Sequence, residues 1–359
     1  KHERFAMERE LRSGERLVVK VVEPPLGKYV DEVGCWADLK DDLLSGRLAE
    51  WLVAPYYVGE IAGEVVGSMA CYTGVDGPEV GLVEFVQTAE AHRRKGIAGV
   101  LMEALVADFV AGGGKALFLC TVNPHAGDLY EKNGFWYLVG DGMRYLAPGA
   151  ENFAEQYLSH QGEARVRAAT WADLPAGAAL FNQAEVDWWI KEYIAGVFGD
   201  TRYERHFVEL MRRTEDGRGA VLVLENPLGR MVGLAAFVRG GGFYEQHVGY
   251  VSCFVCPAYW GQVPEFLAAV GERAGAMSIG VLQTYVADGD EAAIDMWRRG
   301  GFAAEARLRG RLRDGKQTRD LLVFATEIAG AQQQRKSRDD FYGQRNAWQA
   351  QRVARTTSR

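Results

Sequence analysis

Thr88–Leu105, with the sequence TAEAHRRKGIAGVLMEAL, is the stretch that decides the fold. From Ile97 onward its apolar residues recur at helical spacing, which predicts a helix over 97–110. The segment 80–86 just upstream has the apolar composition of a buried strand. The order is therefore a strand, a basic loop that ends at Gly96, and a helix.

Such a loop points unpaired backbone N–H groups and the positive end of a helix dipole at one place, which suits a phosphate or pyrophosphate. Gly96 lets the backbone approach a ligand closely, and a small residue follows at Ala98. Neither a GxxxxGK[ST] nor a GxGxxG motif is present. A solvated run of charge is the alternative interpretation. The predicted phosphate-binding residues are Arg93, Arg94, Lys95, Gly96, Ile97, Ala98 and Gly99.

The spacing Arg93-x-x-Gly96-x-Ala98 resembles the [RQ]-x-x-G-x-[GA] loop with which the GNAT family of N-acetyltransferases holds the pyrophosphate of acyl-CoA. Asn123 and the stretch Asp128–Phe135 (DLYEKNGF) resemble the N-x-x-A-x-x-L-Y-E-K-x-G-F segment of the same family. Glu-Ala-His at 90–92 departs from the usual Pro-Glu-Tyr. The resemblance implies acetyl-CoA, or another acyl-CoA, as co-substrate.

The order of predicted elements describes an α/β chain with mixed sheets. Apolar and β-branched runs predict strands, and helical spacing with capping signals predicts helices. The first half is expected to contain strands over 16–23, 56–61, 64–72, 80–86, 116–122, 136–139 and 143–146 and helices over 30–51, 97–110 and 126–132. The second half is expected to contain strands over 164–169, 220–225, 231–238, 248–255, 281–286, 303–311 and 319–326 and helices over 173–183, 186–198, 203–212, 264–277 and 291–299.

The sequence of the second half can be aligned with that of the first at one shift, with a slip of one residue in the earlier hairpins. Phe135 falls on Phe302, and Tyr130 falls on Trp297. A domain-sized repeat of about 150 residues predicts an internal duplication. The expected organisation is a GNAT-like domain over 1–150, a second GNAT-like domain over 160–329, and a basic polar tail over 330–359.

The second copy is expected to be degenerate. At the same shift Gly96 falls on Val263, and Ala98 falls on Glu265, so a carboxylate stands where a pyrophosphate would lie. Like charges in contact weaken binding. The first copy should therefore hold the cofactor, and the second should act as a scaffold or as a lid over the substrate.

The resemblance implies a general acid and a set of oxyanion donors. Tyr130 matches the family tyrosine that protonates the departing CoA sulfur, and core packing beside Phe135 is the alternative. Asn123 matches a position that contacts the pantetheine or orders a water, and a helix cap is the alternative. Unpaired backbone N–H groups around Val86, Gln87 and Thr88 are expected to face the thioester.

Glu84 is the candidate general base. By period-two alternation it should share a face with Leu82 and Val86 and not point plainly to solvent. The alternative is an outward-facing strand glutamate. His92 and His125 are further titratable candidates, expected at the loop surface and at a helix cap.

Aromatic residues near the first helices and hairpin could line the acceptor site, because these elements border that site in the family. Trp36, Tyr57 and Tyr72 are the residues chosen, with Trp51, Tyr56 and the pair Trp188-Trp189 as further candidates. Core or interface packing is the alternative for each.

The composition and net charge of the chain limit the kinds of partner that we expect for the protein. The chain has 359 residues, a net charge of −7 and five scattered cysteines, and no apolar run is long enough to span a membrane. The start, KHERFAMERE, lacks the apolar core of a secretory signal. We expect a cytoplasmic protein with no bound metal, no membrane partner and no nucleic-acid partner. The sequence leaves open whether the protein forms a homodimer. Cys253-x-x-Cys256 has no second pair beside it, which argues against a metal or redox site.

The sequence therefore predicts an acyl-CoA-dependent N-acyltransferase that transfers acetyl directly to the amine of a small molecule, a metabolite or an antibiotic, in a ternary complex. Transfer to oxygen or sulfur is one alternative. A non-catalytic acyl-CoA-binding or regulatory module is the other.

Overall fold

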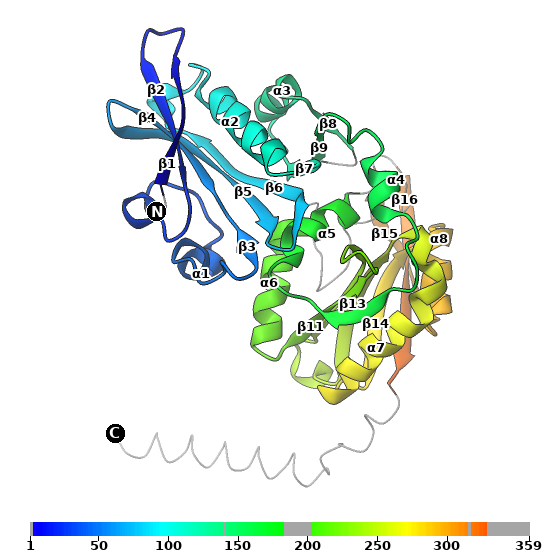
Figure 1. Ribbon diagram of the computed structural model, residues 1–359. Helices are drawn as coiled ribbons and strands as arrows, with labels where there is room; N and C mark the ends of the chain where they lie inside the picture. Colours follow the sequence, from blue (N-terminus) through cyan, green and yellow to red (C-terminus); the bar gives the residue numbers. More distant parts are fainter. Residues whose placement is uncertain (1–2, 139–140, 183–202, 315–316, 329–359) are drawn as a thin grey trace, which may run out of the picture.

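The computed structural model describes residues 3–138, 141–182, 203–314 and 317–328 and shows two mixed β-sheets with helices around them (Figure 1). This confirms the predicted α/β fold class. The helix predicted over 186–198 and the basic tail lie outside the described residues.

The first sheet has nine strands among the described residues, in the order β1-β2-β4-β5-β6-β7-β9-β8, with β3 paired to β5. Neighbours are antiparallel except β6 and β7, which are parallel. The strands are β1 (Glu3–Glu10), β2 (Arg16–Val22), β3 (Leu52–Val53), β4 (Tyr56–Ile61), β5 (Glu64–Gly74), β6 (Gly77–Thr88), β7 (Ala116–Cys120), β8 (Phe135–Tyr137) and β9 (Gly142–Leu146).

Two helices, α2 (Ile97–Ala111) and α3 (Pro124–Lys132), cover one face of this sheet (Figure 1). Leu101 of α2 is fully buried in one cluster with Leu17 of β2 and Met69 of β5. Among the described residues of its own half, the opposite face receives one short helix, α1 (Lys40–Leu44), and the 3₁₀ turns Gly27–Tyr29 and Ala37–Leu39.

The second sheet has seven strands among the described residues, in the order β10-β11-β12-β13-β14-β16-β15, and only β13 and β14 are parallel. The strands are β10 (Arg165–Ala168), β11 (Gly219–Glu225), β12 (Met231–Arg239), β13 (Val248–Val255), β14 (Val281–Ala287), β15 (Ala303–Asp314) and β16 (Gln317–Glu327). The helices are α4 (Phe153–Leu158) between the halves, then α5 (Asp173–Phe181), α6 (Tyr203–Glu215), α7 (Val263–Ala276) and α8 (Glu291–Arg299).

Apart from β1 and β3, the two sheets follow the same path. Each has three antiparallel pairs, then one parallel pair, then two more antiparallel pairs, and the last two strands in space are crossed in chain order. In each sheet a helix connects the two parallel strands, α2 in the first and α7 in the second. The path of the chain in the two halves is therefore equivalent.

The two halves share one hydrophobic core. Helix α5 lies between the sheets and contacts β5, β6 and β7 on one side and β12 and β13 on the other (Figure 1). Its Leu174 and Ala178 are 0% and 1% exposed and belong to the same cluster as Tyr72, Leu82 and Phe118 of the first sheet. The face of the first sheet opposite α2 is thus buried largely by the second half.

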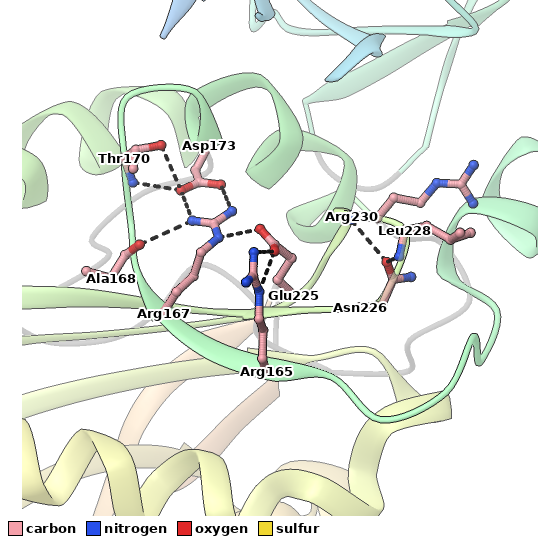
Figure 2. Close-up of polar contacts among 9 residues, drawn as sticks. All are labelled: Arg165, Arg167, Ala168, Thr170, Asp173, Glu225, Asn226, Leu228 and Arg230. Atoms are coloured by element: carbon pink, nitrogen blue, oxygen red, sulfur yellow. Dashed lines mark hydrogen bonds and ion pairs between the residues drawn. The ribbon is translucent and has the colours of Figure 1, made fainter. Parts of the chain in front are cut away.

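A buried ion-pair network anchors the start of α5. Figure 2 shows Arg167 of β10 between Asp173, the first residue of α5, and Glu225 of β11. Arg167 donates two hydrogen bonds of 2.7 Å to the Asp173 carboxylate and one to Glu225. Arg165 adds hydrogen bonds of 2.9 and 2.6 Å to Glu225. A carboxylate in the first helical turn also suits the helix dipole, so the network fixes α5 to its sheet.

The prediction of a mostly helical segment over 30–51 is wrong. Only Lys40–Leu44 is α-helical, and Trp36 is extended. The reason is Gly34, where an added Cβ would lie 2.8 Å from the Cβ of Phe85. This close approach to β6 is a tertiary contact that overrides the helical spacing.

Strands β1 and β3 and helix α4 were not predicted. Strand β1 has no buried residue and hence no apolar alternation. Ion pairs hold it instead: Glu3 pairs with Lys20 of β2 at 3.0 Å, and Arg9 pairs with Glu103 of α2 at 2.9 Å. Helix α4 lies in the segment expected to link the halves.

Candidate functional site

Strand β6 carries a bulge where the site was predicted. Its register against β5 shifts between Glu84 and Gln87, so Phe85 and Val86 lie opposite the single residue Met69. Phe85 has a φ of 55°, a left-handed backbone that costs a bulky residue on the order of 1–3 kcal/mol. Strain of this kind persists only where the surrounding packing holds it, and it is concentrated at functional sites.

The bulge separates residues that simple alternation placed together. Leu82 packs in the cluster shared with the second half, whereas Val86 packs against the cluster of α2. The prediction that Glu84 shares a face with Val86 is therefore wrong, because the extra residue turns the strand over. Glu84 stays on the side of Tyr72. There burial raises the pKa of the Tyr72 hydroxyl well above its usual value, and the Glu84 charge adds to the rise.

Strands β6 and β7 part beside the bulge. Their parallel pairing consists of three residue pairs and ends at Leu82 and Phe118, while β6 continues to Thr88. Past this point the edge of β6 that faced β7 is no longer paired with it. Backbone N–H groups of Val86 to Thr88 lie in this stretch, where the sequence predicted oxyanion donors.

The loop after β6 has a backbone suited to an anion. Arg94 and Gly96 have φ angles of 64° and 88°, and α2 begins at Ile97 without a side-chain cap. A Cβ added at Gly96 would meet nothing within 4 Å, so no other group crowds the loop on this side of Gly96. Successive N–H groups in turns of alternating handedness form a concavity that binds anions, and the helix dipole adds to it.

The basic side chains of this loop are not equivalent. Arg93 and Arg94 are exposed, and Arg93 Nε donates to the carbonyl of Thr88 at 3.3 Å. Lys95 Nζ instead pairs with Glu15 at 2.8 Å, and this hydrogen bond holds the pKa of Glu15 below its usual value. His92 Nδ1 lies 3.5 Å from Lys95 Nζ. Lys95 thus ties the loop to the turn between β1 and β2.

Tyr130 and Asn123 lie on and before α3. Tyr130 is 6% exposed, its ring centre is 5.9 Å from that of Phe135, and it belongs to the core on the α2 side of the sheet. Asn123 caps α3, with its side-chain oxygen accepting the backbone N–H of His125 at 3.1 Å. The capping role raised as an alternative for Asn123 is therefore present.

Aromatic rings gather on the other side of the bulge. The Trp36 ring lies 4.8 Å from that of Phe85 and 5.3 Å from that of Tyr72, whose hydroxyl is 2.8 Å from the hydroxyl of Tyr56. Phe85 was missed as a site residue because LVEFVQ has the pattern of an ordinary strand, and one sequence contains no signal for the bulge.

Tyr57 does not join this group. It points to the α2 face, where its hydroxyl donates to Asp108 at 3.1 Å. Strand alternation puts it on the opposite side from Tyr56. Trp188 and Trp189 lie outside the described residues.

The second half lacks these features at the equivalent place. Strands β12 and β13 pair without a register shift. Between Val255 and Val263, all of which is described, no residue has a positive φ, and the segment forms a 3₁₀ helix over Pro257–Gln262. Glu265 lies in the first turn of α7. The backbone before α7 therefore differs from that of the loop before α2.

The ends of the halves are alike. Trp297 of α8 lies 4.7 Å from Phe302, as Tyr130 lies beside Phe135. The intervening Gly301 and Gly134 have φ angles of 83° and 85°. The same helix-to-strand turn therefore occurs in both halves with different side chains.

Cys253 and Cys256 are buried thiols that form no disulfide, and the Sγ of Cys256 donates to the carbonyl of Leu158 at 3.2 Å. The described residues contain no group of three or more potential metal ligands. Among the helices that the structure describes, none combines the length and apolar character needed to cross a bilayer.

Comparison with known proteins gives a family match for part of the chain. Residues 29–135 match the model of the acetyltransferase (GNAT) family. No curated protein matches the chain.

Three similar solved structures illustrate the relation. The ribosomal-protein-alanine N-acetyltransferase from Brucella melitensis is 27% identical, with a TM-score of 0.39, over 46% of this chain and 99% of that chain. The acetyltransferase of the GNAT family from Streptococcus pneumoniae is 20% identical, with a TM-score of 0.39, over 46% of this chain and 100% of that chain. The phosphinothricin acetyltransferase from Sinorhizobium meliloti, in complex with AcCoA, is 14% identical, with a TM-score of 0.40, over 46% of this chain and 89% of that chain. The similarity to the acetyltransferase (GNAT) family lies in residues 29–135 of this chain.

Proposed function

We propose that the chain is an acyl-CoA-dependent N-acyltransferase whose working site lies in residues 1–150 and whose residues 160–329 are a duplicated copy without a cofactor loop. The observation that carries the proposal is the succession along β6 and α2. A strained bulge, an unpaired strand edge and an open left-handed loop follow one another between Leu82 and Ile97. In β13 and α7 neither the bulge nor the left-handed loop occurs.

The residues present suit the diphosphate of an acyl-CoA. The N–H groups from Gly96 to Gly99 belong to a helix start without a side-chain cap, nothing crowds a Cβ at Gly96, and the exposed Arg93 and Arg94 directly precede this start. Backbone donors together with arginine forks are the usual partners of phosphate oxygens. Lys95, which is paired with Glu15, steadies the loop.

The chemistry follows from the two faces of the sheet. The acceptor amine attacks the thioester carbonyl carbon from the side of Glu84, which takes the proton that the nitrogen must lose. N–H groups of Val86 to Thr88 stabilise the negative charge that develops on the carbonyl oxygen. The carbon–sulfur bond breaks, and Tyr130, on the α2 side, gives its proton to the sulfur. The products are the N-acylated amine and free CoA.

The place of the acceptor follows from the same geometry. Trp36 and Phe85, which are half-buried, lie on the Glu84 side of β6 next to the fully buried Tyr72, away from α2 and its loop. A flat apolar wall beside a carboxylate suits a protonated amine with an organic body. We propose a small amine as acceptor and acetyl as the acyl group.

The test uses the full chain. Acetyl-CoA is mixed with a panel of amines, alcohols and thiols, and release of free CoA is followed with a thiol-reactive dye beside calorimetric titration with CoA. We expect amine-dependent release and one CoA per chain. Release that needs only alcohols or thiols would contradict the choice of acceptor. CoA binding without any release would make the chain a binding module, and two CoA per chain would overturn the proposal for the second half.

A further inference from the structure

Arg212 of α6, in the second half, reaches across to the segment of the first half that leads into α1. Its Nε and Nη2 groups donate hydrogen bonds of 3.0 and 2.7 Å to the backbone carbonyl of Asp38. Nη2 also pairs with the carboxylate of Asp42, and Nη1 donates to Glu215 at 2.7 Å. The guanidinium carbon lies 5.3 Å from the centre of the Trp171 ring. The Arg212 guanidinium is thus held by hydrogen bonds along its edge and by the Trp171 ring against its face.

The carbonyl that Arg212 binds belongs to the turn after Trp36. Asp38 is the middle residue of the 3₁₀ turn Ala37–Leu39, and this turn is closed by the N–H of Leu39 donating to the carbonyl of Trp36 at 3.0 Å. Trp36 itself is extended, with a ψ of 129°. A hold on Asp38 therefore limits the movement of the Trp36 backbone.

Trp36 in turn packs on the bulge. Its ring lies 4.8 Å from that of Phe85, the strained residue next to Glu84. A continuous series of contacts thus joins Arg212 of the second half to the wall of the proposed acceptor site.

We propose that Arg212 is a positioning residue of the acceptor site, through which the second half sets the place of Trp36 relative to Glu84. This inference rests on the proposed function. It gives the second half a specific part in the reaction, in addition to the burial that α5 provides. The acceptor site is then built from both halves, whereas the acyl-CoA loop is built from the first alone.

Arg212→Lys separates positioning from charge. A lysine ammonium keeps the positive charge near Asp42, but it has no planar fork with which to donate twice to the Asp38 carbonyl while also binding Asp42 and Glu215. The variant should keep the ion pair and lose the hold on the turn. A misplacement of a reacting geometry by about 1 Å can cost up to roughly 100-fold in rate.

Arg230 offers a matched control. It also belongs to the second half, lies 4.9 Å from an aromatic ring, that of Tyr157, and pairs with a first-half carboxylate, Glu79, at 3.1 Å. Its Nη1 donates to the carbonyl of Gln156 at 3.0 Å. Glu79 is near the start of β6, about 16 Å along an extended strand from Glu84. Arg230→Lys therefore weakens the same kind of contact between the halves away from the proposed acceptor site.

The experiment compares the wild-type chain with Arg212→Lys and Arg230→Lys. We expect Arg212→Lys to lower kcat/KM for the amine by roughly 10- to 100-fold with the KM for acetyl-CoA unchanged. Amides over 36–44 should exchange hydrogen for deuterium faster in this variant. Arg230→Lys should change neither quantity, and the melting temperatures of the two variants should fall alike.

Equal kinetic losses in the two variants, or an equal rise in the KM for acetyl-CoA, would overturn the positioning role of Arg212 and leave the proposed function intact. Unchanged exchange over 36–44 in Arg212→Lys would also overturn it. A wild-type chain without amine-dependent turnover would overturn the proposed function, and the acceptor role of Arg212 with it.

Discussion

Glu84 and Val86 are two residues apart on one strand and face opposite sides of the first sheet, because the bulge at Phe85 adds a residue between them. This geometry puts the proposed base on the proposed acceptor side, while the next backbone donors continue toward the proposed acyl-CoA loop. The bulge at Phe85 thus divides the proposed site between two faces of the sheet.

The first prediction concerns that base. Glu84→Gln should lower kcat for amine acylation by about 100-fold or more, because an amide cannot accept the amine proton at neutral pH. Affinity for CoA should stay the same. Glu64→Gln, at an exposed position on β5, controls for the loss of one negative charge. A rate equal to that of this control would remove Glu84 from the mechanism.

The second prediction concerns the acid. Tyr130→Phe removes only the hydroxyl, so the fold should persist and kcat should fall by about 100-fold, measured by release of free CoA. Tyr145→Phe is the control, because Tyr145 packs against the same Phe135, with its ring centre 5.6 Å away. Similar losses in the two variants would indicate that Tyr130 acts only through packing.

The third prediction concerns the loop. Gly96→Glu puts a carboxylate where a diphosphate should bind and should weaken CoA binding at least about tenfold by calorimetry, equivalent to roughly 1.4 kcal/mol. Gly149→Glu is matched to it: Gly149 has a φ of 83° against 88° at Gly96, and a Cβ meets nothing within 4 Å at either position. It carries the same backbone strain and the same added charge away from the loop. CoA affinities that do not differ between the two variants would argue against the loop.

The fourth prediction tests the shared core. Leu174→Ala empties space between α5 and both sheets and should cost about 2–5 kcal/mol of unfolding free energy. Unfolding in denaturant should remain one transition, with circular dichroism and tryptophan fluorescence coincident. Leu228→Ala, at a position 57% exposed, should change stability by less than about 0.5 kcal/mol. Two separate transitions would mean that the halves fold independently.

The fifth prediction concerns acid stability. Burial alone would raise the pKa of Glu225, but hydrogen bonds from Arg167 and Arg165 outweigh it and hold the pKa below the usual 4.5. A carboxyl with a lowered folded pKa stabilises the fold above its unfolded pKa and loses this contribution as the pH falls through the folded value. Glu225→Gln should therefore flatten the fall in melting temperature below about pH 4.5. Asp216→Asn, in an exposed ion pair with Arg218, should leave that slope unchanged.

Where the sequence had a clear period, the structure follows it. The bounds predicted for β4, β13 and α8 match the observed ones. Strands β4 and β13 are short runs of mostly buried residues, and α8 buries one apolar side that includes Ile294 and Trp297. The strand–loop–helix unit of β6 and α2 was found for the same reason.

The misses have physical causes. Gly34 must lie against Phe85, so the segment around it does not form the helix that its sequence suggests. Strand β1 depends on ion pairs to Lys20 and to Glu103, which leave no apolar pattern. The bulge depends on how β5 and β6 are aligned, and this alignment is not encoded in the local pattern of either strand. Glu84 and the anion loop could therefore be proposed from sequence, whereas Phe85 and Arg212 needed the fold.

Helix α5 has a consequence for anyone who would engineer this chain. Since its two sides pack against two different sheets, neither half can be produced alone without exposing the apolar surface that is now buried around α5. A change of specificity will therefore have to treat the two halves as one folding unit, in which the half proposed to be non-catalytic is kept.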